Sequence, residues 1–119
     1  MAAATSACAL ASMVIPDRAN SQGNNKISPC KITVVKRVVF NDLYEKYRNS
    51  EGSVCPKFKE EQEFIAKTPW EPPKDFCVWA WADIRSYIHG VCYGNSNKVI
   101  VCCTDAFRPV TFKLERIDG

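Results

Sequence analysis

Residues 98–117 read KVIVCCTDAFRPVTFKLERI, which is two apolar segments joined by a polar turn. In the second segment Val110, Phe112 and Leu114 alternate with polar residues, so their side chains point to one face of a strand. Such alternation is typical of an antiparallel sheet with one face in water. We therefore predict a hairpin of two strands, Lys98–Thr104 and Val110–Ile117, connected by Asp105–Pro109.

The segment before this hairpin has the periodicity of a helix. Four of its apolar residues recur at i, i+4, i+7 and i+11: Cys77, Trp81, Ile84 and Ile88. That spacing places them on one face, which we expect to be buried. Asp75 is a suitable N-cap and Gly90 a suitable C-terminal stop.

The first third of the expected domain contributes two strands and a short helix. Lys31–Phe40 is rich in β-branched residues and predicts a strand, and Gln62–Lys67 predicts a second, shorter one. Between them, Asn41 is a candidate cap for a short helix that ends near Arg48. The helix would place Leu43, Tyr44 and Tyr47 on one side. The predicted fold class is α+β, a small antiparallel sheet with one principal helix and a short second helix.

Residues 1–29 differ in character from the rest of the chain. Ala2–Ile15 is small and apolar and resembles the core of a secretory signal, although no Lys or Arg precedes it. A disordered extension is the alternative. We predict a signal-like leader and linker over residues 1–29 and a single domain over residues 30–119. A cleaved signal implies a periplasmic or extracellular protein, and its absence a cytoplasmic one. The apolar run is too short to span a membrane.

Charge and cysteine content limit the classes of function. The 16 basic and 13 acidic residues are interspersed, without the basic stripe that nucleic-acid binding requires. The chain has seven cysteines, an odd number that cannot all pair within one molecule. They form no C-x-x-C motif, which argues against a thioredoxin-like site or a zinc knuckle.

Four cysteines are the candidate site residues: Cys55, Cys77, Cys102 and Cys103. Cys77 lies at the start of the principal helix, where free N–H groups stabilise a thiolate. Cys55 precedes Pro56 in a constrained loop. Consecutive strand residues point to opposite faces, so we expect only one of Cys102 and Cys103 to share a site with Cys77 unless the strand is bulged.

Several roles are open to these thiols. Three thiolates with His89 or a fourth sulfur suit Zn²⁺, and soft ligands also suit Cu(I) or an iron–sulfur cluster. An oxidising compartment would instead favour disulfide or redox chemistry. Cysteines also pack as inert core residues.

A second candidate site is a ligand or partner surface formed by Trp70, Trp79 and Arg108. Aromatic residues beside prolines line ligand grooves, as well as ordinary cores. Arg108 precedes Pro109 and is placed to bind an anion or to pair with Asp83.

Two stretches of the chain carry a resemblance to a known family. Residues 76–84 fit F-C-x-W-A-W-x-D-I, and residues 102–116 fit C-C-T-D-x-x-R-P-V-x-F-K-x-E-R. Both resemble a small uncharacterised family of bacterial and archaeal proteins of about a hundred residues. The resemblance covers about Lys31–Ile117. It implies that Cys55, Cys77, Cys102 and Cys103 belong to the family pattern, and it brings no activity.

The function that we predict is a small cysteine-based metal-binding or redox accessory module. It would serve a larger enzyme or another protein, and we do not expect it to be an enzyme itself. The alternative is a non-catalytic interaction domain with structural cysteines and a tryptophan-rich partner surface.

Overall fold

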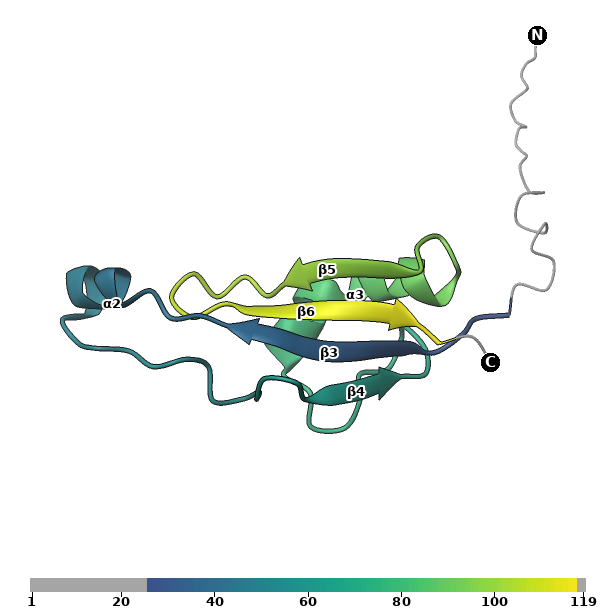
Figure 1. The fold of residues 1–119 in the computed structure, drawn as a ribbon, viewed down its shortest axis with the longest axis horizontal. Coiled ribbons are helices and arrows are strands. Elements are labelled where there is room, and N and C mark those ends of the chain that lie inside the picture. Colours follow the sequence, from purple (N-terminus) through teal and green to yellow (C-terminus); the bar gives the residue numbers. More distant parts are fainter. Residues whose placement is uncertain (1–25, 118–119) are drawn as a thin grey trace, which may run out of the picture.

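The computed structural model describes residues 26–117, which form an antiparallel sheet with a helix on one face (Figure 1). Residues 1–25 of the predicted leader and linker, with Cys8, lie outside the described residues. The elements, in chain order, are β3 (Cys30–Arg37), α2 (Asn41–Arg48), β4 (Glu63–Ala66), α3 (Val78–Cys92), β5 (Lys98–Cys102) and β6 (Val110–Arg116). The predicted α+β class, with one principal and one short helix, is confirmed.

The four strands are ordered β4-β3-β6-β5, and every neighbouring pair is antiparallel. The predicted β5–β6 hairpin pairs Val101 with Phe112 and Val99 with Leu114. β3, the first strand of the described residues, lies in the middle of the sheet next to β6, and its register shifts between Val34 and Lys36.

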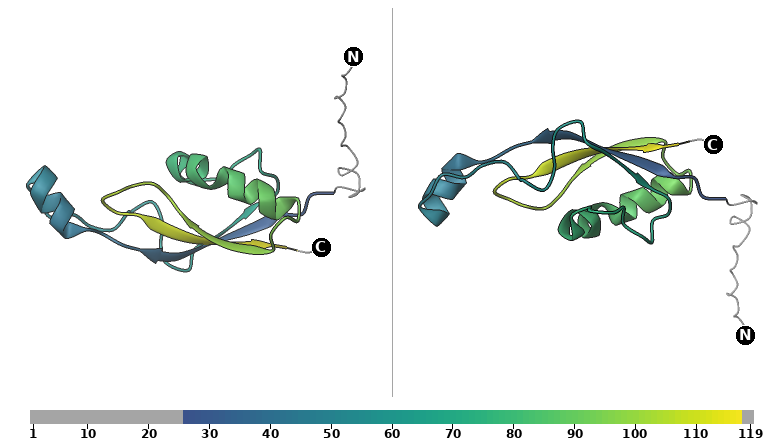
Figure 2. Two further views of the ribbon diagram at one scale, coloured as in Figure 1. Left: turned by 90° about the horizontal axis from the view of Figure 1, so that it is seen from above. Right: turned by 90° about the horizontal axis from the view of Figure 1, so that it is seen from below.

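The sheet has one dry face and one wet face, as the alternation in β6 predicts. Val110, Phe112 and Leu114 are fully buried, together with Ile32 and Val34 of β3. α3 lies across this dry face (Figure 2). Of the predicted stripe, the helix buries Trp81, Ile84 and Ile88, whereas Cys77 precedes the helix and is only partly buried. Sheet and helix share a single core.

The ends of α3 differ from the prediction. Asp75 does not cap the helix: it has a left-handed backbone (φ 65°), and Cys77 is the N-cap residue. Gly90 does not end the helix either, because the helix continues to Cys92. Gly94 supplies the left-handed conformation just beyond that end (φ 87°). Tertiary packing of Val91 and Cys92 extends the helix past the glycine.

The short helix α2 lies at one end of the molecule, away from α3 (Figure 1). Its N-cap is Phe40 rather than the predicted Asn41, whose Oδ1 instead accepts a hydrogen bond from the Gly52 N–H (3.0 Å). Tyr44 is buried, whereas Tyr47, predicted to share its side, is 65% exposed.

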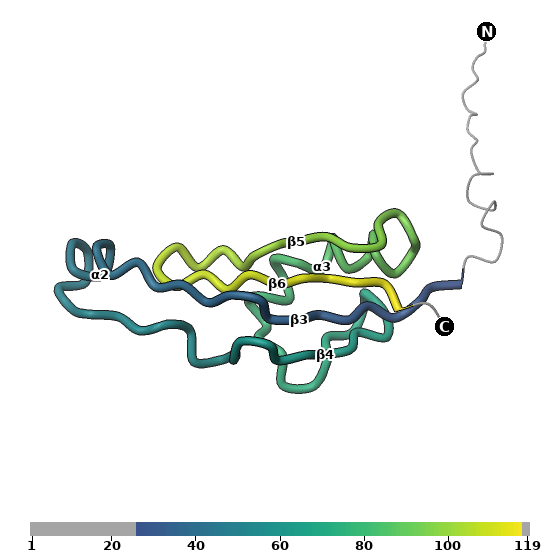
Figure 3. The backbone as a smooth tube through the Cα atoms, viewed as in Figure 1, coloured from purple at the N-terminus to yellow at the C-terminus, as the bar shows by residue number. Residues whose placement is uncertain are grey.

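A long connection returns from α2 to β4 along the edge of the sheet (Figure 3). Backbone bonds attach it to β3: the Glu61 N–H donates to the Val34 carbonyl (2.7 Å), and the Val34 N–H donates to the Gln62 carbonyl (2.9 Å). The connection also carries Cys55. No helix within residues 26–117 has the length and apolar character needed to cross a membrane.

Candidate functional site

Three of the four candidate cysteines line one pocket of about 450 Å³. Cys55 comes from the long connection, Cys77 directly precedes α3, and Cys103 directly follows β5. All three side chains are partly buried and packed against the core. Charged groups surround them at the rim: Lys57, Asp83, Asp105 and Arg108.

The fourth candidate, Cys102, does not line this pocket. It is the last residue of β5 and is exposed. Cys103 is turned the other way, where its sulfur accepts a hydrogen bond from the Val110 N–H (3.4 Å). The structure thus separates the adjacent pair, and only Cys103 lies with Cys55 and Cys77.

Arg37 positions the loop that carries Cys55. Its Nη1 donates to the carbonyl oxygens of Cys55 (3.0 Å) and Phe58 (2.7 Å). Its Nε and Nη2 both bond one oxygen of Glu60, at 3.0 and 2.8 Å. The hydrogen bond from Arg37 lowers the pKa of the Glu60 carboxyl. The guanidinium therefore fastens the loop to the end of β3 at three acceptors.

Asp83 likewise positions the segment that carries Cys103. Its Oδ2 accepts a hydrogen bond from the Thr104 N–H (2.8 Å), and its Oδ1 accepts one from the Thr104 hydroxyl (3.1 Å). Asp83 belongs to α3, so these bonds join the helix to the turn after β5. They also connect residues 76–84 with residues 102–116.

Arg108 lines the cysteine pocket, but its partner is Asp105 rather than Asp83. Its Nε lies 3.7 Å from Asp105 Oδ2. Asp105 Oδ1 meanwhile accepts the backbone N–H groups of Phe107 (2.9 Å) and Arg108 (3.1 Å), as an aspartate in a turn commonly does. The ion pair therefore stays within the β5–β6 connection.

Cys77 occupies the N-cap position, one residue before the first turn of α3. Its backbone is extended, and its side chain makes no capping hydrogen bond. Its carbonyl accepts the first helical bond, from the Trp81 N–H (2.9 Å). The thiol is left available to the pocket.

The described side chains do not form a ready metal site. Nowhere in residues 26–117 do three Cys, His, Asp or Glu side chains lie close enough together to hold a metal ion. His89, one alternative to a fourth sulfur ligand, lies elsewhere on α3. There it contacts the rings of Trp70 (5.4 Å between centroids) and Tyr93 (4.6 Å). Metal binding by the cysteines stays a prediction.

The two candidate tryptophans lie at different pockets. Trp79 lines the cysteine pocket with Arg108 and is 79% exposed. Trp70 lines a second pocket together with Trp81. The structure therefore places Trp70 apart from the other two members of the predicted surface.

Two further cysteines, Cys30 and Cys92, are fully buried in the core. Burial and the nearby Cys92 raise the pKa of Cys30 from 9.0 to about 12, and burial also raises the pKa of Cys92. Both thiols are thus neutral in the folded protein over a wider pH range than in the unfolded chain.

We expect this burial to make the fold sensitive to alkali. A raised pKa in the folded state means that stability is complete below pH 9.0 and falls as the pH rises towards about 12. For Cys30, the loss in the free energy of unfolding approaches about 1.4 kcal/mol per pH unit. This slope is measured by urea unfolding of the wild type and of Cys30→Ala between neutral and alkaline pH. An equal slope in the two proteins would contradict the assignment.

Comparisons of the chain with family models, with curated proteins and with solved structures find no match.

Proposed function

We propose that this domain is a cysteine-based redox module that exchanges a disulfide with a partner protein. The proposal rests on one observation: three thiols from three separate segments line one pocket. Arg37 and Asp83 hold two of those segments in place. A disulfide can form only between thiols that come close together, and the shared pocket is the observation that favours such an approach among these three.

The exchange would proceed in two balanced steps. The Cys77 thiolate attacks one sulfur of the partner's disulfide, forming a mixed disulfide and releasing the other sulfur as a thiolate. Cys103 or Cys55 then attacks the Cys77 sulfur and releases the second partner sulfur. The chain loses two thiol protons and gains one disulfide, and the partner gains two thiols. No cofactor enters the balance.

The rim of the pocket suits contact with a protein. Val78 and Trp79 directly follow Cys77, and their side chains are 67% and 79% exposed. Exposed tryptophans are enriched among the residues that dominate protein interfaces. A partner that docks on Trp79 would bring its disulfide next to Cys77, which fits an accessory role.

The adjacent cysteines provide a matched test. Protein purified without air is treated with glutathione disulfide, the remaining thiols are alkylated, and bridged peptides are identified by mass spectrometry. We expect a disulfide between two of Cys55, Cys77 and Cys103 that dithiothreitol reverses. Cys103→Ser or Cys77→Ser should change or abolish it. Cys102→Ser, one residue away on the exposed side, should leave it unchanged.

Two results would overturn the proposal. One is that no disulfide forms among the pocket cysteines of the folded protein. The other is stoichiometric Zn, Cu or Fe by elemental analysis, lost in Cys77→Ser and Cys103→Ser but kept in Cys102→Ser. That result would make the thiols metal ligands instead.

A further inference from the structure

A second pocket, of about 570 Å³, lies along the other flank of α3. Pro69 and Trp70 line it from the loop after β4, and Trp81, Arg85, Ser86 and His89 line it from the helix. At 100° per residue, Trp81 and Arg85 lie about 120° or more around α3 from Trp79 and Asp83. The pocket shares no lining residue with the cysteine pocket.

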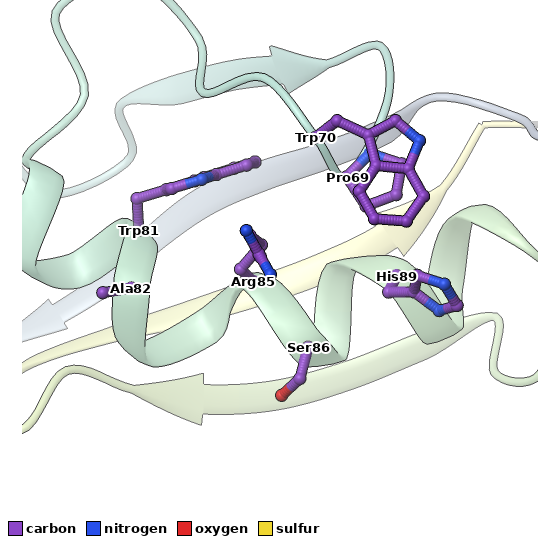
Figure 4. Close-up of a pocket in the computed structure, with 7 residues that line it drawn as sticks. All are labelled: Pro69, Trp70, Trp81, Ala82, Arg85, Ser86 and His89. Carbon is purple, nitrogen blue, oxygen red and sulfur yellow. The ribbon is translucent and has the colours of Figure 1, made fainter.

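Two indole rings form its apolar walls. Figure 4 shows Trp81 and Trp70 on either side of Arg85. Trp81 is 8% exposed and is fixed by an edge contact with Phe76 (6.1 Å). Trp70 is held by the edge-on ring of His89 and by a hydrogen bond from its backbone N–H to the Thr68 hydroxyl (3.2 Å). Trp81 is therefore fixed in the core, whereas Trp70 is 59% exposed.

The polar groups of this pocket favour a negative charge. Arg85 is exposed, and within the described part of the chain its guanidinium makes no hydrogen bond or ion pair. No carboxylate lines the pocket. Ser86 and His89, one and four residues after Arg85, also line the pocket.

We propose that this pocket binds a small molecule with a flat aromatic ring that carries an anionic group. The ring would pack against the faces of Trp70 and Trp81, because offset aromatic pairs are favourable in such partly dry sites. The anion would meet Arg85, whose planar fork matches the oxygens of a carboxylate or a phosphate. The site is independent of the cysteine chemistry.

Calorimetric titration with four probes tests whether binding requires both the aromatic ring and the anionic group. The first two, naphthalene-2-carboxylate and adenosine monophosphate, carry ring and anion and distinguish a carboxylate from a phosphate ligand. The other two, cyclohexanecarboxylate and 2-naphthylmethanol, each lack one half. We expect at least one complete probe to bind, and both partial probes to bind about tenfold more weakly or worse. Binding should weaken as the salt concentration rises.

Variants locate the site on the protein. Arg85→Gln and Trp70→Ala should each weaken the complete probe about tenfold or more. Lys46→Gln, which removes a positive charge on the distant α2, should not change binding. Thermal melts check that each variant is folded. Failure of both complete probes to bind would overturn the proposal, as would equal affinity in wild type and folded Arg85→Gln.

Discussion

Replacing Phe58 with Ala is expected to lower the free energy of unfolding by about 3–5 kcal/mol. Phe58 is 2% exposed and makes edge contacts with the rings of Phe64 (5.9 Å), Phe76 (5.2 Å) and Phe112 (5.1 Å). Its removal leaves a cavity where a loop, β4, β6 and the segment before α3 meet. Urea unfolding followed by circular dichroism measures the loss.

The matched control is Phe40→Ala. Phe40 is 40% exposed at the junction of β3 and α2, so truncating it should cost about 1 kcal/mol or less. Equal losses for the two variants would contradict the central place of Phe58. Because Phe58 also lines the cysteine pocket, the stability of the core and the shape of the candidate site depend on the same ring.

Periodicity predicts the sheet and the principal helix well, because burial repeats every second residue in β6 and along one stripe of α3. The position of Phe58 has no such signal. It lies in a connection without regular structure, and only the meeting of distant segments makes it central. The predicted ends of α3 were wrong for a related reason. Asp75 and Gly90 were chosen from local sequence preferences, whereas packing of residues further along the chain sets the helix boundary.

The candidate site, like the fold, could be predicted only in part from the sequence. Strand alternation is enough to predict that the side chains of Cys102 and Cys103 point to opposite faces. The structure places only Cys103 in the pocket. The groups that hold the cysteines in place, Arg37 and Asp83, could not be identified from the sequence. Each bonds a residue about 20 positions away, and no spacing rule connects such partners. Arg85 and Trp70 likewise meet only when the loop after β4 folds against α3.

Replacing Arg37 with Ala should affect both stability and the environment of one candidate cysteine. The side chain is 20% exposed and donates to the carbonyls of Cys55 and Phe58, which would lose their partner. Hydrogen bonds from a charged group contribute about 1.5–3 kcal/mol, so we expect a loss of that size in the free energy of unfolding. The freed loop should also expose Cys55, and its alkylation by iodoacetamide, followed by mass spectrometry, should become faster.

Two companion variants separate the carbonyl bonds from the ion pair. Glu60→Gln removes the charge partner of Arg37 and leaves both hydrogen bonds to the carbonyls of Cys55 and Phe58. Because exposed ion pairs contribute little to stability, iodoacetamide should alkylate Cys55 at the same rate as in the wild type. Arg37→Lys keeps the charge without the planar fork, and should behave more like Arg37→Ala. If Glu60→Gln freed Cys55 as much as Arg37→Ala does, the ion pair would be what holds the loop. If no Arg37 variant changed the alkylation of Cys55, the loop would be held by its backbone bonds to β3 alone.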